Sequence, residues 1–280
     1  MKQYHEITKA LKEADAVLIG ASNGFSISEG LHLFAENQAF IDLFSDFKHK
    51  YRIRNILQGC SFSYPAETEK WAFWSRLIWH YNGQYTGSPN TENLKKLITD
   101  KPYLIVTSNG EGHFSLSGFD KERIIELEGN WLTMQCAHAC HQTLYPTSEI
   151  IKEMAQAEKN GSIPDALIPK CPKCGGNMQI HVPINRYFIP NKKAQEIFHS
   201  FIQKYHGKKL VVLEMGIGYK NQMIKVPFME LVQQEPNAAY IIINKGEIYI
   251  PSSIREKSYG LDGDITEILS LLASEYDIIA

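Results

Sequence analysis

The sequence has no long hydrophobic run and no excess of charge of either sign, and each absence excludes a class of protein. No segment approaches the roughly 18 to 20 apolar residues that cross a membrane, and the opening MKQYHEITKALKEAD lacks the apolar core of a secretory signal. The 29 Lys and Arg nearly balance the 31 Asp and Glu, so no broad basic field attracts a nucleic acid. We therefore expect a cytoplasmic protein that binds neither a membrane nor a nucleic acid.

Cysteine is also scarce, with five residues in 280, which is too few for a disulfide scaffold. Four of them form two close pairs, Cys136-x3-Cys140 and Cys171-x2-Cys174, and the second pair is followed by two glycines. Four thiolates on two such turns can close tetrahedrally on zinc, which makes a structural zinc site the favoured interpretation. Buried free thiols or a redox pair are the alternatives. His138 and His141 lie close by in the sequence, and we expect them beside the site rather than among the ligands.

Apolar residues are plentiful, at 44% of the chain, and several of them form short runs typical of buried strands. Helical patterns separate these runs, which predicts an α/β fold with a Rossmann-like, mostly parallel sheet covered on both faces. In such a sheet, ligands bind beyond the carboxyl ends of the strands. The predicted strands are Ala16–Ile19, Tyr103–Val106, Ile124–Leu127, Leu210–Leu213 and Tyr240–Ile243.

The pattern divides the chain into two domains. Residues 1–132 and 184–280 are predicted to form the Rossmann-like sheet domain, with a helical insertion at about 28–98. Residues 133–183 are predicted to form a small zinc-binding module. Thr68 is the expected cap of an aromatic helix with a mainly structural role, and Asp264 is the expected cap of the last helix.

Polar and glycine residues follow the predicted strands. The turn GASNGFS contains Gly20, Gly24 and Ser26, which suit a diphosphate or serve only as a turn. Asn109 can donate to and accept from a water, a ribose hydroxyl or a carboxamide. Glu128 can accept from a ribose hydroxyl or offset positive charge on a sugar. A surface glutamate or a helix cap is the alternative for Glu128.

Several motifs occur in an order that resembles the sirtuin family. They are GASNGFS, TSNGEGHF, ELEG before the first cysteine pair, CPKCGG, the GIG turn, the Asn244 that follows a strand, and GDITEIL. The segments EKWAFWSR and EMGIG are most similar to the microbial class M sirtuins, which are typically encoded beside a macrodomain hydrolase. The resemblance spans nearly the whole chain.

The resemblance implies that NAD binds in a cleft between the Rossmann-like domain and the zinc module. Asn109 falls on the position that contacts the nicotinamide ribose, and Ser108 and Glu111 fall near the nicotinamide amide. The positions expected to line the diphosphate and the same ribose are Gly20, Ala21, Ser22, Gly24, Phe25 and Ser26. The expected adenosine-side positions are Gly216, Gly218, Asn244, Asp264 and Ile265, and the implied zinc ligands are Cys136, Cys140, Cys171 and Cys174.

The departures from the family pattern bear on the reaction. Glu128 replaces the catalytic histidine of ordinary sirtuins, and a glutamate is a weaker base than imidazole at neutral pH unless burial raises its pKa. Glu111 replaces an aspartate, and Ser108 replaces a glutamine. Ordinary deacylation is therefore disfavoured, and we expect Asn109 and Glu128 to be the catalytic residues of another NAD-dependent reaction.

By analogy with class M sirtuins, that reaction is mono-ADP-ribosylation of a protein. The implied acceptor is a lipoylated carrier related to the glycine-cleavage H protein, and a macrodomain hydrolase is the implied partner that acts on the product. An NAD hydrolase or a residual NAD-dependent deacylase is one alternative. A non-catalytic sensor that binds NAD or ADP-ribose is another.

Overall fold

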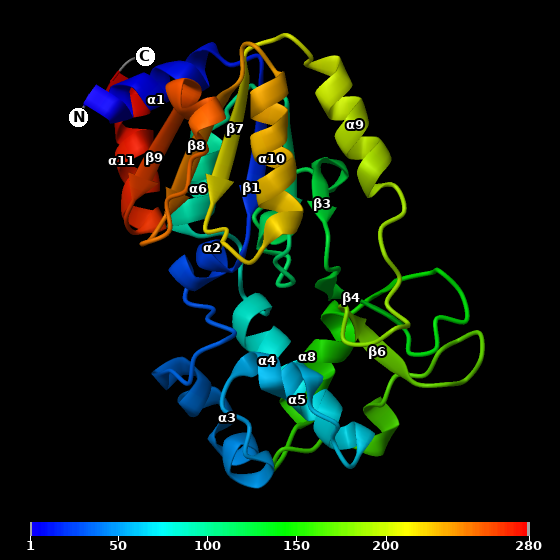
Figure 1. The fold of residues 1–280 in the computed structure, drawn as a ribbon. Helices are drawn as coiled ribbons and strands as arrows, with labels where there is room; N and C mark the ends of the chain where they lie inside the picture. Colours follow the sequence, from blue (N-terminus) through cyan, green and yellow to red (C-terminus); the bar gives the residue numbers. More distant parts are fainter. Residues whose placement is uncertain (1, 279–280) are drawn as a thin grey trace.

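The computed structural model describes residues 2–278 and has two lobes (Figure 1). The larger lobe holds a six-stranded sheet with helices on both faces, and both ends of the described chain lie on it. The smaller lobe consists of helices beside a three-stranded sheet. The chain passes between the lobes more than once. The carboxyl ends of the strands of the large sheet face the small lobe (Figure 1).

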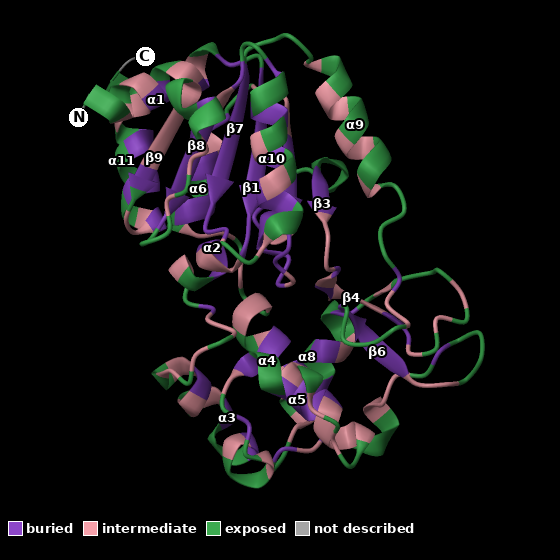
Figure 2. Ribbon diagram, viewed as in Figure 1, coloured by how far each residue is buried: buried purple, intermediate pink, exposed green. Residues whose placement is uncertain are grey.

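The large sheet is entirely parallel, in the order β3-β2-β1-β7-β8-β9. It confirms the predicted α/β, Rossmann-like fold, and each predicted apolar run lies in one of its strands, except that Leu127 falls one residue beyond β3. β1 and β7 are buried along their whole length, as expected of strands covered on both faces (Figure 2). The strands are β1 (Ala16–Ala21), β2 (Tyr103–Thr107), β3 (Ile124–Glu126), β7 (Leu210–Met215), β8 (Ala239–Asn244) and β9 (Ser258–Asp262).

Two helical layers sandwich this sheet, because successive side chains of a strand point to opposite faces. Val17 and Ile19 of β1 pack into one core, beneath α1 (Lys2–Glu13), α6 (Pro89–Leu97) and α11 (Ile265–Ile278). Ala16 and Leu18 pack into the opposite core, together with α10 (Gln222–Gln234) and α9 (Ala194–Lys204).

The small lobe has a core of its own, which combines helices from the first third of the chain with the cysteine-bearing segment. The aromatic side chains Trp71, Phe73 and Trp74 lie at its centre, as the sequence predicts. Its helices are α3 (Gln38–Tyr51), α4 (Ile56–Ser61), α5 (Glu67–Asn82) and α8 (Ser148–Ala157). Its sheet has the order β5-β4-β6 and consists of β5 (Tyr145–Pro146), β4 (Asn130–Cys136) and β6 (Met178–His181). The exact domain limits stay a prediction.

The remaining elements are short. They are α2 (Asn23–Ser28), α7 (His113–Leu116), η1 (Lys121–Arg123), η2 (Asp165–Leu167) and η3 (Ser252–Lys257).

Of the two predicted helix caps, only one is correct. Asp264 caps α11, because its Oδ1 accepts from the backbone N–H groups of Thr266 at 2.9 Å and Glu267 at 3.2 Å. Thr68 does not cap α5, because that helix begins one residue earlier, at Glu67, after an uncapped Ala66. Within residues 2–278, no helix is both long and apolar enough to cross a membrane.

Candidate functional site

Three neighbouring strands of the large sheet end at the same edge, and polar residues follow each of them. Ser22 follows β1, Ser108 and Asn109 follow β2, and Glu128 lies two residues beyond β3. Because β1, β2 and β3 are parallel neighbours, their carboxyl ends lie side by side. The structure thus brings together the polar strand ends on which the sequence-based site depends.

A cavity of about 510 Å³ opens at this edge, between the two lobes. Its large-lobe wall is mostly polar, and its small-lobe wall is mostly apolar. The large-lobe wall consists of Asn23, Ser108, Gly110, Glu128, Lys220, Asn221, Gln222 and Met223. The small-lobe wall and its connections consist of Leu33, Phe34, Leu57, Cys60, Trp74, Trp131, Val182, Pro183 and Ile184.

Asn109 does not itself line the cavity, but it lies in the sequence between the lining residues Ser108 and Gly110 and is only 4% exposed. Neither Oδ1 nor Nδ2 of its side chain has a hydrogen-bond partner among the residues that the structure describes. Unpaired polar atoms at such burial are costly, so they call for a partner such as a ligand or an ordered water.

Glu128 lies in the cavity wall and is half-buried. Its burial raises the pKa of the carboxyl group above the usual range, which strengthens it as a proton acceptor near neutral pH. A second carboxyl group, that of Glu126, lies two residues earlier in the chain. Burial is the main cause that raises the pKa of Glu126 to about 7, and a hydrogen bond from Asn130 Nδ2 opposes that shift. Sequence reasoning missed Glu126, although ELEG contains it, because only Glu128 falls on a known catalytic position.

Ser26 and Glu111, which are both expected cofactor contacts, form a buried pair. Ser26 Oγ donates to Glu111 Oε1 at 2.8 Å. Burial raises the pKa of the Glu111 carboxyl group, while the nearby His113 opposes that shift.

His113 is itself part of a buried polar cluster that the sequence analysis missed. Its Nδ1 lies 2.7 Å from Glu29 Oε2, the Tyr85 ring stacks on the imidazole with centroids 3.7 Å apart, and Tyr85 Oη donates to Glu29 Oε1. Its Nε2 is buried and unpaired within the described chain. The letters GEGH offered a sequence signal, but only the fold brings Glu29 to this histidine.

Three of the expected diphosphate positions are packed into the protein interior. Ala21 and Phe25 lie in a core of the large lobe, and Phe25 stacks on Phe114. Gly20 faces α10, because an added Cβ would lie 2.6 Å from the Phe228 ring. Their contacts in this structure are therefore with the protein itself.

Gly24 permits a close approach of two backbone turns. Its N–H donates to Gly216 O at 2.9 Å, and an added Cβ would lie 2.5 Å from Gly216 Cα. Gly216 has a φ of +62°, and a Cβ there would lie 2.4 Å from Phe25 N. The turn after β1 is thus fastened to the turn after β7, and the N–H of Gly24 is already used.

The expected adenosine-side residues gather at the ends of β7, β8 and β9. Asn244 Nδ2 donates to Ile217 O and Glu247 O, both at 3.3 Å, and so supports the turn that contains Gly218. Ile265 is 4% exposed and belongs to a core of the large lobe, where it follows the capping Asp264.

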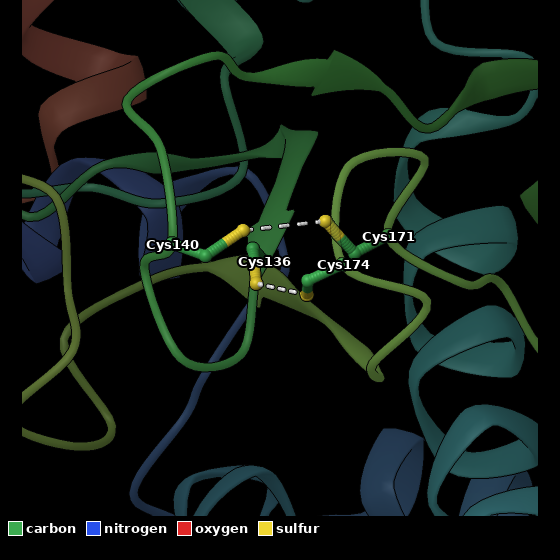
Figure 3. A group of neighbouring side chains, drawn as sticks. All are labelled: Cys136, Cys140, Cys171 and Cys174. Carbon is green, nitrogen blue, oxygen red and sulfur yellow. Dashed lines mark hydrogen bonds between the residues drawn. The ribbon is translucent and has the colours of Figure 1, made fainter.

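The four paired cysteines come together in the small lobe (Figure 3). Their sulfur atoms all lie within 4.8 Å of one another, with Cys136 Sγ 3.7 Å from Cys174 Sγ and Cys140 Sγ 3.6 Å from Cys171 Sγ. Four thiols at this spacing fit a tetrahedral zinc ion. His141 lies beside the set, with Nδ1 3.0 Å from Cys140 Sγ.

The chain is similar to known proteins over nearly all its length, although no family model matches it. It is 33% identical to the protein ADP-ribosyltransferase of Staphylococcus aureus (strain Mu50 / ATCC 700699), covering 96% of this chain and 86% of that protein. It is 24% identical to a probable bifunctional ADP-ribose hydrolase/ADP-ribosyltransferase of Fusarium oxysporum f. sp. cubense, covering 94% of this chain and 46% of that protein.

Solved structures of Sir2 proteins share the fold. A mutant Sir2 homologue in complex with ADP-ribose has a TM-score of 0.63 at 15% identity, covering 98% of this chain and 96% of that one. A second Sir2 enzyme structure has a TM-score of 0.59 at 16% identity, covering 100% of this chain and 99% of that one.

Proposed function

Because this chain belongs to the sirtuin family, we propose that it is an NAD-dependent protein mono-ADP-ribosyltransferase. It cleaves the bond between nicotinamide and ribose in NAD and transfers ADP-ribose to a protein acceptor. The name of the Staphylococcus aureus relative supports the transfer reaction. The observation that carries the proposal is the buried, unpaired amide of Asn109, which follows β2, together with Glu128 in the cavity wall beyond the neighbouring parallel strand β3.

The residues present fit NAD. The unpaired Asn109 amide offers the two N–H donors of Nδ2 and the acceptor Oδ1 to a ribose hydroxyl or a carboxamide, and Ser22 and Ser108 add hydroxyl groups at the adjoining strand ends. The Ser26–Glu111 pair presents a carboxyl group at the position that the resemblance assigns to the nicotinamide amide.

Two carboxyl-group roles follow from this arrangement. When nicotinamide leaves with the bonding electrons, positive charge develops on the ribose, and the ionised Glu128 stabilises it. When the acceptor atom bonds to the same ribose carbon, Glu128 accepts the proton that the acceptor loses, a step favoured by its raised pKa. Asn109 orients the ribose in both steps.

The acceptor in this proposal is a lipoylated carrier protein. The apolar small-lobe wall supports this acceptor, because Phe34, Leu57 and Ile184 line the cavity, remain exposed to solvent and can contact the hydrocarbon part of a lipoyl arm. A macrodomain hydrolase that removes the ADP-ribose is the proposed partner enzyme. The bifunctional name of the Fusarium relative, which joins a hydrolase to a transferase, supports this pairing.

The proposed zinc ion is structural. Cys136, Cys140, Cys171 and Cys174 supply a complete tetrahedral ligand set, which leaves no position for a catalytic water. When bound, zinc fixes the two turns that carry these residues at one end of the small sheet. The cluster lies in the small lobe, and none of its cysteines lines the proposed NAD cavity.

Transfer of radiolabel from adenylate-labelled NAD tests the proposal. The protein is incubated with a lysate that contains lipoylated carriers, beside the Asn109→Ala variant, and nicotinamide release is followed in parallel. A discrete protein band that requires Asn109 is expected. Nicotinamide release without any band would instead identify an NAD hydrolase or a deacylase. Neither signal, with ADP-ribose still bound, would identify a non-catalytic sensor.

A further inference from the structure

Asn221 occupies the gap between the ends of β1 and β2, although it comes from a distant part of the chain. It lies at the end of the segment that joins β7 to α10. Its Nδ2 donates to Ser108 Oγ at 2.9 Å and to Ser22 Oγ at 3.1 Å, and Ser108 Oγ donates to Ser22 Oγ at 2.9 Å. One amide group therefore bridges two serines that are themselves expected cofactor contacts.

The Asn221 side chain bonds to these serines instead of capping the helix that it precedes. Asn221 is the N-cap residue of α10, and asparagine at this position usually accepts from the first turn of the helix. Here it makes no such capping bond. The orientation of the Asn221 side chain is thus set by its bonds to the two serines rather than by a capping bond to the helix.

The cluster leaves hydrogen-bonding capacity unused. Both hydrogens of the Asn221 amide and the Ser108 hydroxyl hydrogen are engaged, whereas the Ser22 hydroxyl hydrogen has no acceptor assigned to it. Asn221 Oδ1 is buried and has no partner in residues 2–278. A free donor and a free acceptor in a buried site match a ligand with both kinds of group, such as a ribose beside a phosphate.

The segment that carries Asn221 is anchored at its start and exposed in its middle. The N–H of Gly216 donates to Ile243 O at 2.9 Å, and the N–H of Tyr219 donates to Glu247 Oε2 at 3.0 Å. Tyr219 and Lys220 are exposed, and Lys220 and Met223 line the cavity on either side of Asn221. The side chain can therefore change partners without a change in the sheet.

From these contacts we infer that Asn221 is a further cofactor-positioning residue, which bridges Ser22 and Ser108 in the free protein and passes its amide to the dinucleotide when that enters the cavity. The Ser108 hydroxyl, which donates to Ser22 in the free protein, and the Ser22 hydroxyl, whose hydrogen has no acceptor there among the described residues, then both donate to the ligand. This inference rests on the proposed function, because it takes a dinucleotide as the ligand.

Calorimetric titration of the full-length chain with ADP-ribose tests the inference without any turnover. Asn221→Ala is expected to weaken binding about tenfold, because a hydrogen bond to a charged group contributes about that factor. Asn90→Ala is the matched control, since Asn90 Nδ2 also donates to a serine, Ser28 Oγ at 2.8 Å, but lies outside the cavity wall. The control is expected to bind within twofold of the parent.

A second variant keeps the shape of the side chain. Asn221→Asp replaces the amide donor with a carboxylate that can only accept from the two serines, and it presents a negative charge to the diphosphate, so its affinity should fall more than tenfold at low salt. The loss should shrink at high salt, because ions screen the repulsion. A purely structural bridge predicts no such salt dependence.

The outcomes separate the two proposals. If the parent binds ADP-ribose and both Asn221 variants bind it equally well or more tightly, the role of Asn221 is refuted while the proposed function stands. If the parent itself binds neither ADP-ribose nor NAD, the proposed function fails and this inference fails with it.

Discussion

Replacing Asn109 with alanine should separate activity from stability, because this buried side chain makes no hydrogen bond within the described protein. A buried unpaired polar group costs roughly 1–3 kcal/mol, and the substitution removes both a donor and an acceptor. The small void left by the lost amide opposes that gain. We therefore expect the free energy of unfolding to stay within about 1 kcal/mol of the parent or to rise.

The rate should respond in the opposite way. Removal of one group that orients the reacting ribose is expected to lower NAD cleavage by at least about 100-fold. Nicotinamide release measures the rate, and urea unfolding followed by circular dichroism measures the stability.

Asn90→Ala is again the matched control. Asn90 is 1% exposed, against 4% for Asn109, and its Oδ1 is likewise unpaired within the described residues, but its Nδ2 donates to Ser28 Oγ. This control should lose about 1 kcal/mol of stability and keep its activity. If Asn109→Ala loses more than about 2 kcal/mol, or keeps the parent rate, the assignment of Asn109 to a ligand is wrong.

Zinc, Glu128 and Arg76 allow three more tests. Stripping the metal should unfold the small lobe, since a structural zinc contributes on the order of 10 kcal/mol; an unchanged melting temperature after verified metal loss would rule out the structural role. Glu128→Gln should slow nicotinamide release at neutral pH, and a faster variant would contradict charge stabilisation. Only the parent should lose activity as the pH falls through the pKa of Glu128, which is raised above the usual 4.5. Because a raised carboxyl pKa costs stability as pH rises through it, the same variant should be at least as stable as the parent at neutral pH, which thermal melting checks. Arg76→Ala should cost about 1–2 kcal/mol in urea unfolding, because the guanidinium donates to the carboxylates of Asp46 and Glu158. This loss is smaller than that of a fully buried pair, since the Asp46 side chain is 45% exposed. A loss under about 0.5 kcal/mol would show that solvent screens the whole cluster.

Elements with strong local patterns were predictable from the sequence. The apolar runs of β1, β2, β7 and β8 are short, continuous and bounded by polar or glycine residues, and each is a strand. β9 was not predicted, because Ser258–Asp262 has only one buried side chain and its strand forms by pairing with β8. β4 was missed for a similar reason, since its pattern of buried positions is irregular.

The candidate site divides in the same way. The spacing of the cysteines and the polar residues after each strand are local features, so Asn109, Glu128 and the cysteine cluster stand out in the amino-acid sequence alone. The pairing of His113 with Glu29 joins positions 84 residues apart, and the bridge from Asn221 to Ser22 joins positions 199 residues apart. No local pattern signals contacts over such separations.

The sequence by itself determined the fold class, the strand ends and the cysteine set, because short-range hydrophobic patterns and ligand spacing encode them. Only the tertiary structure decided which polar groups are already paired inside the protein and which are left for a ligand. Gly24 is engaged with Gly216, whereas the Asn109 amide is left free. The physical reason is that hydrogen bonding at a buried site depends on every segment that packs around it, and those segments meet only in the folded chain.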